Sequence, residues 1–462
     1  MRSAPRISNR EFARRRMELM QVMEPNSIAI LPASQSKNRN GDVDYSFRQD
    51  SDFYYLSGFA ETDSVFVLVP GRRHGESILF CRERDEDFER WNGPLCGPDR
   101  ARQLYGLEDA FPMEDIDEIL PGMIEGKDKL YYAMGVNRDF DNQIIEWVNS
   151  ISAKKKYGAE PPGEFVQLGQ FLHELRLFKS KQEIALLKHA ANITTKAHTV
   201  AMQRAAAGVY EYQLEAELQY VFLKEGARSP ASPIIVGSGH NSCILHYIGN
   251  TEVLKDGDLV LIDAGCEYQY YACDATRTFP VNGCYTGEQK AIYEIVLRAQ
   301  KAAIEMVRPG NSWNQPHQAA VRVVCEGLSD LGLLKGEIEE LIETEAFKQF
   351  YMHKTGHWLG MDVHDVGEYK IGSEWRVFEA GMVLTVEPGI YISNDPVAAE
   401  GSRLNQVSAG APAWVPVEVP PRWRGLGIRI EDDLLVTKDG NEVLTGGIPK
   451  EIDEVEHLLA TS

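Results

Sequence analysis

The sequence predicts a mixed α/β protein, and three observations support this fold class. The 462 residues are 43% hydrophobic and 25% charged, as in ordinary globular proteins, and roughly 100 to 200 residues per domain imply more than one domain. Short apolar runs alternate with stretches of helical periodicity along the chain. A polar, turn-rich stretch at residues 152–180 separates two parts, so we expect domains over residues 1–178 and 179–462.

The charge of the chain is strongly negative. It has 69 Asp and Glu residues against 48 Lys and Arg residues, a formal net charge of −21 at pH 7. Such a surface repels phosphate backbones and anionic lipid, so we expect neither nucleic acid nor a membrane as a partner. No stretch approaches the ~18 apolar residues of a membrane span. The seven cysteines lack C-x-x-C spacing, which favours a reduced, cytoplasmic protein without a thiolate zinc site.

The first domain is expected to combine a sheet with helices. Phe12, Arg16 and Leu19 recur at helical spacing, which favours a first helix with a solvated basic face over an organelle transit peptide. Residues 138–149 form a second stretch that could be helical. Four apolar runs are typical of buried strands: Ser27–Leu31, Ser64–Val69, Ser77–Cys81 and Lys129–Ala133.

The second domain begins with a helix signal and contains a weak internal repeat. Ser180 and Glu183 have capping-box spacing in front of an apolar stripe, after a short helical segment that ends around Lys179. A helix–glycine–helix pattern occurs at residues 196–213 and again at residues 301–318. This pattern is common, so a duplication stays open. A real duplication would give two similar halves around a pseudo-twofold interface, where a pocket is expected.

Carboxylates occupy unusual positions in the predicted strands of this domain. Residues 258–266 and 271–279 predict a hairpin that turns near residues 268–269. Period-two alternation places Asp263 at the end of an apolar row and Asp274 on the face of Ala272 and Thr276. The two carboxylates would then lie opposite or nearly opposite each other. Two carboxylates at such a short distance repel each other unless a proton or a metal ion lies between them.

Two later strands repeat this pattern. Glu387 ends the run 382–387 just before a Pro-Gly turn, and Glu431 lies in the run 427–436 on the same face as Arg429. A single acid at such a position is more often a surface or salt-bridged residue. The four carboxylates together therefore indicate a metal site more strongly than any one of them.

Three histidines strengthen the metal hypothesis. His353, His357 and His364 lie within twelve positions among glycines and apolar residues. The first two have the spacing of an H-E-x-x-H zinc site, but Lys354 replaces the catalytic Glu and Gly356 weakens a helix, which excludes that motif. Four carboxylates and one His suit manganese, cobalt or iron, and two ions ~3.5 to 4 Å apart would use all of them.

Motifs in both parts of the chain resemble a known family. In the second domain, the resemblance lies in Leu261–Gly265, Cys273–Phe279, His353–Asp365, Thr385–Gly389 and Gly427–Asp432. In the first domain it lies in Tyr45–Phe59. The chain thereby resembles the M24 metallopeptidase family and, within it, bacterial enzymes of the aminopeptidase P type. The resemblance implies a creatinase-like amino-terminal domain and a carboxy-terminal pita-bread α/β domain, whose internal symmetry agrees with the repeat.

The resemblance also implies the roles of individual residues. It implies two divalent metal ions, manganese before cobalt, zinc or iron, of which Asp274 and Glu431 would bridge the pair. The full set of implied metal ligands is Asp263, Asp274, His357, Glu387 and Glu431. The implied substrate contacts are His246 in the motif Cys243–Tyr247, His353 and His364, with Arg429 and Trp91 lining a proline pocket.

The implied reaction is removal of the amino-terminal residue from peptides that have proline in the second position. A hydroxide between the two ions would attack the carbonyl before proline, Glu387 would act as general acid/base, and His364 or His246 would donate hydrogen bonds. His353 completes the implied catalytic group. Expected partners are such peptides and further copies of the chain, in a cytoplasmic homodimer or homotetramer.

Alternatives to this reaction remain. An Xaa-Pro dipeptidase shares all five ligands, whereas a methionine aminopeptidase lacks an amino-terminal domain of this size. An inactive pita-bread binding protein is the alternative outside the enzymes. The chain also departs from the family pattern twice, because Lys354 stands where a small residue is usual and the expected loop Asn394–Arg424 is unusually long.

Overall fold

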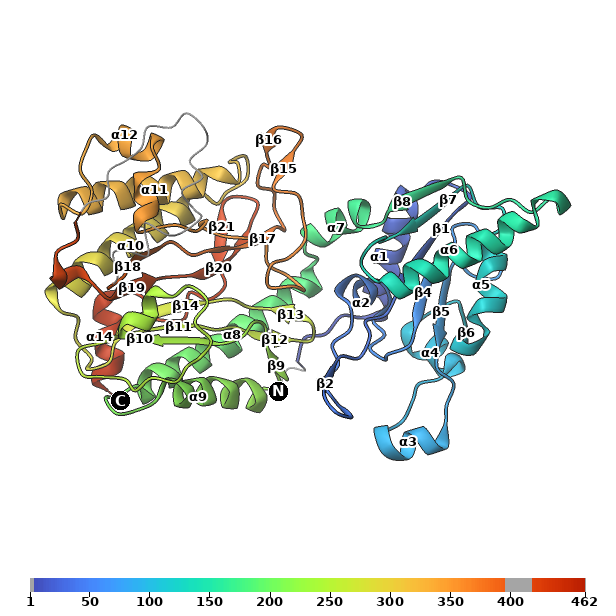
Figure 1. Cartoon of the computed structure of the whole chain (residues 1–462), viewed down its shortest axis with the longest axis horizontal. Helices are drawn as coiled ribbons and strands as arrows, with labels where there is room; N and C mark the ends of the chain where they lie inside the picture. Colours follow the sequence, from blue (N-terminus) through green and yellow to red (C-terminus); the bar gives the residue numbers. More distant parts are fainter. Residues whose placement is uncertain (1–3, 395–417, 462) are drawn as a thin grey trace. The chain divides into compact units, whose positions relative to one another are not determined.

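The computed structural model describes residues 4–394 and 418–461. They divide into two compact units: Ile7–Leu175 is one, and the other contains the chain from Arg176 onward (Figure 1). Mixed α/β structure in both units confirms the predicted fold class. No helix in the described parts of the chain is long and apolar enough to span a membrane.

The first unit is built around a mixed six-stranded sheet with the order β6-β5-β4-β1-β7-β8. Its strands are β1 (Ser27–Pro32), β4 (Val65–Leu68), β5 (Ser77–Cys81), β6 (Asp109–Pro112), β7 (Lys129–Tyr132) and β8 (Glu164–Gln167). β1 and β4 pair antiparallel in the middle, and β7 adds to β1 in parallel. All four strands predicted from apolar runs are therefore confirmed, and they lie in one sheet.

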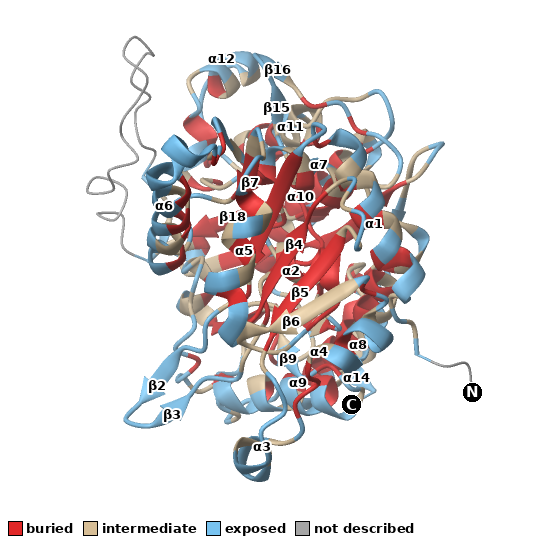
Figure 2. Ribbon diagram, turned by 90° about the vertical axis from the view of Figure 1, so that its right-hand side faces the viewer, coloured by how far each residue is buried: buried red, intermediate tan, exposed pale blue. Residues whose placement is uncertain are grey.

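The first unit also contains helices. They are α1 (Asn9–Val22), α2 (Ser51–Ser57), α3 (Glu86–Asn92), α4 (Pro98–Tyr105), α5 (Ile116–Ile124), α6 (Arg138–Ala153) and, at the boundary, α7 (Gly169–Leu177). Leu120 of α5 and Ile144 and Trp147 of α6 join strand residues in one buried cluster. Figure 2 shows the buried strands β4 and β5, and the exposed hairpin of β2 (Asn38–Asn40) and β3 (Val43–Asp44). The helix expected at residues 138–149 is confirmed.

The first helix differs from its prediction. Helix α1 forms, but Arg15 and Arg16 are buried rather than part of a solvated basic face. Arg15 donates to the carbonyl of Tyr55 at 3.1 Å and lies over its ring, and Arg16 donates to the carbonyl of Leu56 at 3.0 Å. The guanidinium groups thus satisfy carbonyls at the end of α2, where a helix leaves its last acceptors unpaired.

Two helix pairs form much of the second unit. They are α8 (Lys181–Arg204) with α9 (Glu211–Lys224), and α10 (Gly287–Met306) with α11 (Asn314–Asp330). Gly208 and Gly310 lie in the connections with positive φ of 91° and 90°, so the repeated helix–glycine–helix pattern is confirmed. Ser180 and Glu183 form the predicted capping box of α8. The smaller helices are α12 (Ile338–Glu343) and α14 (Ile452–Ala460).

Short sheets lie between these helices. Their strands are β9 (Ser229–Pro230), β10 (Ile235–Ser238), β11 (Leu259–Asp263), β12 (Cys266–Tyr268), β13 (Tyr271–Ala272), β14 (Thr276–Pro280), β15 (Lys370–Ile371), β16 (Glu374–Trp375), β17 (Val383–Val386), β18 (Gly389–Ile392), β19 (Leu426–Arg429), β20 (Asp432–Val436) and β21 (Asn441–Val443). The sheets have the orders β10-β11-β14, β13-β12-β9, β17-β20-β21, β18-β19 and β15-β16. A core of residues from α10, α11 and β17–β20 holds them together.

Three predicted strands are interrupted, which corrects the sequence analysis. The predicted hairpin forms, but each arm breaks into two strands, and Asp263 pairs with Thr276 rather than facing Asp274. Gly265 lies at the break, where a Cβ would be 1.6 Å from the carbonyl oxygen of Cys273. Likewise the run 427–436 is two strands, because β19 pairs with β18 while β20 pairs with β17.

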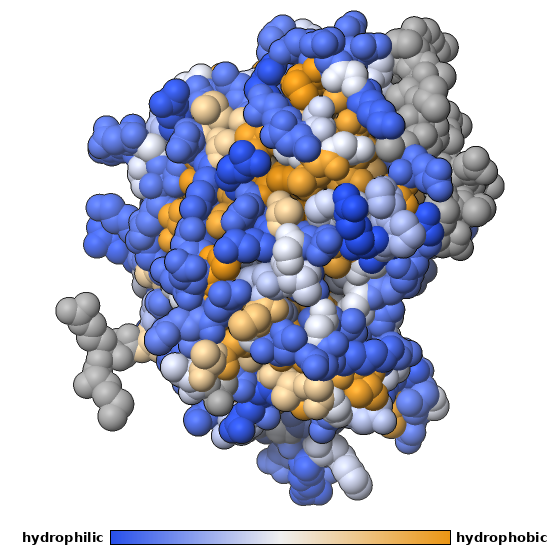
Figure 3. All heavy atoms as spheres, turned by 90° about the vertical axis from the view of Figure 1, so that its left-hand side faces the viewer, coloured by the Kyte–Doolittle hydropathy of each residue, from blue (hydrophilic) through white to orange (hydrophobic). Residues whose placement is uncertain are grey.

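The surface and the predicted loop complete this description. Figure 3 shows one face of the molecule on which hydrophilic residues predominate, with hydrophobic residues between them. Of the loop expected at Asn394–Arg424, residues 395–417 lie outside the described residues. Its last residues include a short 3-10 turn at Pro421–Trp423.

Candidate metal centre

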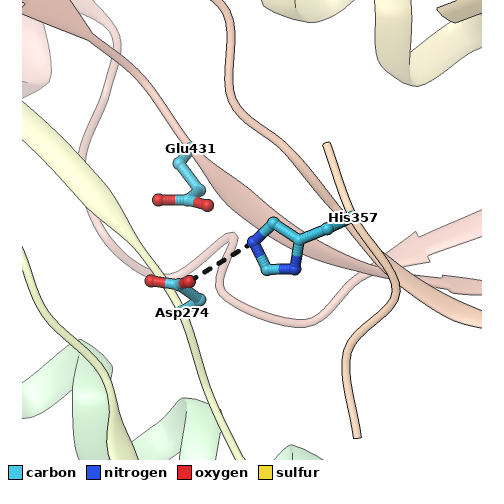
Figure 4. A group of neighbouring side chains, drawn as sticks. All are labelled: Asp274, His357 and Glu431. Atoms are coloured by element: carbon cyan, nitrogen blue, oxygen red, sulfur yellow. Dashed lines mark ion pairs between the residues drawn. The ribbon is translucent and has the colours of Figure 1, made fainter. Parts of the chain in front are cut away.

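Three predicted ligands meet in the second unit. Side-chain ligand atoms of Asp274, His357 and Glu431 lie within 4.8 Å of one another (Figure 4). They come from three segments far apart in the sequence: Asp274 lies between β13 and β14, Glu431 lies between β19 and β20, and His357 precedes β17. The breaks in the predicted strands therefore place two of the carboxylates.

Backbone and side-chain hydrogen bonds fix these carboxylates. The amide of Glu431 donates to the carbonyl of Thr276 at 3.1 Å, and the Thr276 hydroxyl donates to Oε2 of Glu431 at 2.7 Å. The amide of Asp274 donates to Oδ2 of Asp433 at 3.1 Å. Asp274 and Glu431 are 7% and 2% exposed, so neither carboxylate is solvated as a surface acid would be.

The ring of His357 has a defined orientation. Its backbone is held against β17, because its amide donates to Oγ1 of Thr385 at 3.1 Å and its carbonyl accepts from the Thr385 amide at 2.9 Å. Nδ1 lies 3.0 Å from the carbonyl oxygen of Trp358 and must donate to it, since a carbonyl only accepts. Nε2 then points toward carboxylates, at 3.6 Å from both Oδ2 of Asp274 and Oε1 of Glu387.

Glu387 and Asp263 complete the predicted set of ligands. The amide of Glu387, directly after β17, donates to the carbonyl of Thr355 at 2.8 Å. Asp263, the last residue of β11, accepts from Nη2 of Arg429 at 2.6 Å. The charges of Asp274 and Glu387 both act on Asp263, so all five predicted ligands belong to one electrostatic cluster.

A hydrogen-bond chain runs along one side of this cluster. Nη1 of Arg429 donates to the Tyr391 hydroxyl at 2.9 Å, and that hydroxyl lies 2.9 Å from Nε2 of His353. Nδ1 of His353 lies 2.8 Å from the carbonyl oxygen of Lys354 and donates to it. Burial lowers the pKa of His353 to about 3, so its ring is neutral, and Nε2 accepts from Tyr391. Both ring nitrogens of His353 are therefore engaged within the chain.

Burial and mutual repulsion perturb the pKa values of the acids. Burial raises the pKa of Asp263 to about 7, although Arg429 opposes this rise, and burial with neighbouring acids raises the pKa of Glu431 far above its ordinary value. Burial would also raise the pKa of Asp274, but its pairing with His357 lowers it instead. Burial would lower the pKa of His357, yet Asp274 and Glu387 raise it to about 9. The site thus concentrates negative charge that a proton or cation must balance.

These residues fit a divalent cation. Oδ1 of Asp274 is buried without a hydrogen-bond partner among the described residues, although a carboxylate oxygen inside a protein is normally paired. His357 donates its Nδ1 proton to a carbonyl, the arrangement that usually orients a metal-binding imidazole. Carboxylate oxygens with one imidazole are the ligands expected for a hard or borderline divalent ion.

The other predicted site residues occupy different surroundings. The ring of His364 lies 4.3 Å from that of His357, centroid to centroid, and His364 is exposed. His246 is exposed and follows the 3-10 turn Gly239–Cys243. Trp91 belongs to the first unit, where α3 carries it with its side chain 88% exposed. The structure therefore brings together the five predicted ligands, His353, His364 and Arg429.

Sequence analysis missed three residues that shape the centre. Thr276 binds Glu431, Tyr391 joins Arg429 to His353, and Asp433 accepts from the Asp274 amide. Only Tyr391 could have been found from the sequence. Period-two alternation through residues 387, 389 and 391 places it on the same face as Glu387. The roles of Thr276 and Asp433 depend on which strands pair, and alternation does not reveal that.

Comparison with known proteins places both parts of the chain. Residues 185–438 match the model of metallopeptidase family M24, and residues 12–132 match that of the aminopeptidase P N-terminal domain. The chain is 42% identical to the Xaa-Pro aminopeptidase of Escherichia coli over 99% of both chains, and 42% identical to that of Haemophilus influenzae over 98% of both. The solved structure of Pseudomonas aeruginosa aminopeptidase PepP matches with a TM-score of 0.93 and 54% identity over 99% of both chains.

Proposed function

The chain belongs to metallopeptidase family M24, and we propose that it is a metal-dependent Xaa-Pro aminopeptidase. It releases the first residue of a peptide whose second residue is proline. The observation that carries this proposal is the buried cluster of Asp274, His357 and Glu431, in a chain that aligns with Xaa-Pro aminopeptidases over nearly its whole length.

We propose that two divalent ions, manganese before cobalt, zinc or iron, bind at this cluster. The residues that would hold them are Asp263, Asp274, His357, Glu387 and Glu431. The unpartnered Oδ1 of Asp274 and the orientation of His357 support this assignment. When bound, such ions make water nucleophilic near neutral pH and polarise the carbonyl under attack.

The chain's own residues then supply binding and proton transfer. Burial raises the pKa of Glu387 although His357 and Arg429 oppose it, which favours the protonated form that a general acid requires. The nitrogen of the Xaa-Pro bond, like that of any peptide bond, must receive a proton to leave as an amine, and Glu387 delivers it. His364 or His246 donates a hydrogen bond to the oxygen of the carbonyl under attack.

Residues around the cluster hold the substrate. Arg429 lines the pocket for the proline ring. We also assign His353 to the catalytic group. Its hydrogen bonds to Tyr391 and to the Lys354 carbonyl hold its ring beside Glu387. Nδ1 of His353 lies 3.7 Å from Oε2 of Glu387.

Peptide hydrolysis after metal removal tests this function. The chelated protein should not cleave an Xaa-Pro-Yaa tripeptide, and added Mn²⁺, Co²⁺ or Zn²⁺ should restore release of the first residue, with Mn²⁺ most effective. Glu387→Ala should lower kcat at least about 100-fold, the usual contribution of a general acid or base. The matched control is Glu379→Ala, which removes an exposed carboxylate eight residues earlier and should keep full activity.

Two results would contradict the proposal. Cleavage of Xaa-Pro dipeptides with no cleavage of tripeptides would make the protein a dipeptidase. Near-normal turnover by Glu387→Ala with metal bound would remove the role of this residue.

The setting of the protein is also proposed. We place it in the cytoplasm, which its seven free cysteines support. We also propose a homodimer or homotetramer, supported by apolar side chains that α9 exposes, among them Tyr212, Tyr220 and Leu223. Sedimentation of the purified protein distinguishes these states from a monomer.

A further inference from the structure

The second unit contains a cavity that is separate from the candidate metal ligands. It has a volume of about 550 Å³ and lies between β17, the first turn of α11 and the β15–β16 hairpin. None of the five candidate metal ligands lines it. The volume falls within the range of protein sites for small molecules.

Aromatic side chains dominate one part of the wall. Trp313, Tyr369 and Trp375 line the cavity together with Pro316 and Leu384. The rings of Trp313 and Tyr369 lie 4.6 Å apart, centroid to centroid. Such a wall favours a flat aromatic group, because ring packing adds attraction beyond the burial of apolar area.

The charged groups of the wall are mostly positive. Two lysines, Lys354 and Lys370, line the cavity, together with a single acid, Glu368. Among the described residues, neither lysine ammonium has an ion-pair or hydrogen-bond partner, and Lys370 instead lies 4.3 Å from the centre of the Trp375 ring. The amino-terminal end of α11 lies at the same wall and carries the positive partial charge of the helix dipole. The chain as a whole carries a net charge of −21 and repels anions, but the positive groups of this wall attract an anion locally.

We propose that this cavity is a second binding site, which takes a small aromatic carboxylate. The aromatic ring packs against Trp313 and Trp375, and the carboxylate pairs with Lys354 and Lys370. This site is independent of the peptide substrate, because it requires neither the metal ions nor hydrolysis.

The cavity is also connected to the metal centre. Lys354 and Thr355 form part of its wall, and both hold residues of the centre through their carbonyls. The carbonyl of Thr355 accepts from the Glu387 amide at 2.8 Å, and that of Lys354 accepts from His353 at 2.8 Å. On the cavity side, Nδ1 of His317 lies 2.7 Å from the Thr355 hydroxyl. Binding in the cavity is therefore expected to change metal affinity, and metal binding to change carboxylate affinity by the same factor.

Calorimetric titration of the chelated full-length protein tests the site. The probe is 2-naphthylacetate, and its neutral amide is the matched comparison. We expect saturable binding at one site, with the amide about five- to twentyfold weaker because it loses two partly exposed charge pairs. Lys354→Gln and Lys370→Gln should each weaken the acid about two- to fivefold. Lys335→Gln, an exposed lysine outside the cavity, should leave its affinity unchanged.

Further variants distinguish this cavity from the metal centre. Glu387→Gln should bind the probe as the unaltered protein does, because Glu387 does not line the cavity. Mn²⁺ affinity measured with and without saturating probe should differ, and equal values would refute the connection. Absence of saturable binding, equal affinity for acid and amide, or unchanged affinity in both lysine variants would overturn the site.

Discussion

Asp365 follows His364 directly and is held by two buried cations. Arg176 and Lys179 approach its two carboxylate oxygens at 2.6 and 2.8 Å, and all three side chains are at most 3% exposed. Asp365→Ala leaves both cations buried without this carboxylate, so we expect a loss of about 3 to 5 kcal/mol in the free energy of unfolding. Urea denaturation measures it. Asp87→Ala, which removes an exposed partner of Arg90, should cost at most about 1 kcal/mol.

The same carboxylate predicts a pH dependence. Burial alone would raise the pKa of Asp365, but the charges of Lys179 and Arg176 lower it below its ordinary value. A depressed folded-state pKa stabilises the protein above the unfolded value of about 3.9, and this stabilisation disappears as pH falls through the folded value. The difference in unfolding free energy between wild type and Asp365→Asn should therefore be constant from neutral pH to about 5 and shrink below about 4. A constant difference down to pH 3 would contradict the pairing.

Sequence reasoning predicted the candidate ligands that the structure brings together, but not the residues that bind them. Asp263 and Glu387 could be predicted as candidates because each ends an apolar run, and because Asp274 and Glu431 repeat an acid among predicted strands. The hydrogen bond from Thr276 to Glu431 could not be predicted, because it joins residues 155 positions apart whose strands pair with other strands. Long-range pairing, rather than local pattern, determines these contacts.

At the scale of elements, the pairing of distant chain segments explains which strand boundaries could not be predicted. The patterns gave strands and helices at nearly the observed positions, yet 427–436 is divided between two sheets. Alternation continues through this division, so no local signal marks it. Glu431 lies in the gap between β19 and β20, free of regular pairing on either side, and there it reaches Asp274 and His357.

Gly356 allows the segment that contains His357 to lie close against β17. A Cβ at this position would be 2.0 Å from the carbonyl oxygen of Thr385, a backbone atom that cannot rotate away. Gly356→Ala should therefore displace His357 and weaken metal binding roughly 10- to 100-fold, the usual cost of losing a group that orients a ligand. Titration of the chelated protein with Mn²⁺ measures this change.

The control for this variant is Gly287→Ala. Gly287 is the first residue of α10, and a Cβ there has no atom within 4 Å. Its metal affinity should equal that of the unaltered protein. Equal affinity in Gly356→Ala as well would show that the segment can move without loss of the site.

At the scale of the whole molecule, the acid excess has two separate consequences. The proposed ligands include four of the 69 acidic residues. Their positions at or near the ends of strands, and not the overall acid content, bring these four together. Many of the other acids lie on exposed surface, where they are solvated and favour solubility. Net charge therefore indicates which partners to exclude, whereas the function depends on where a few acids are buried.

The two units should respond differently to metal. Each has its own buried core, one around the six-stranded sheet and one around α10, α11 and β17–β20, while all five proposed ligands belong to the second. A ligand stabilises only the folded unit that binds it, by about 2.7 kcal/mol at a hundredfold excess over Kd. Calorimetry of the chelated protein should show two transitions, of which Mn²⁺ raises one. Asp365→Ala should lower the Tm of that same transition, because Arg176, Lys179 and Asp365 belong to the metal-binding unit. A single transition that Mn²⁺ shifts as a whole would mean that the units unfold together, and stability at the metal centre would then depend on both cores.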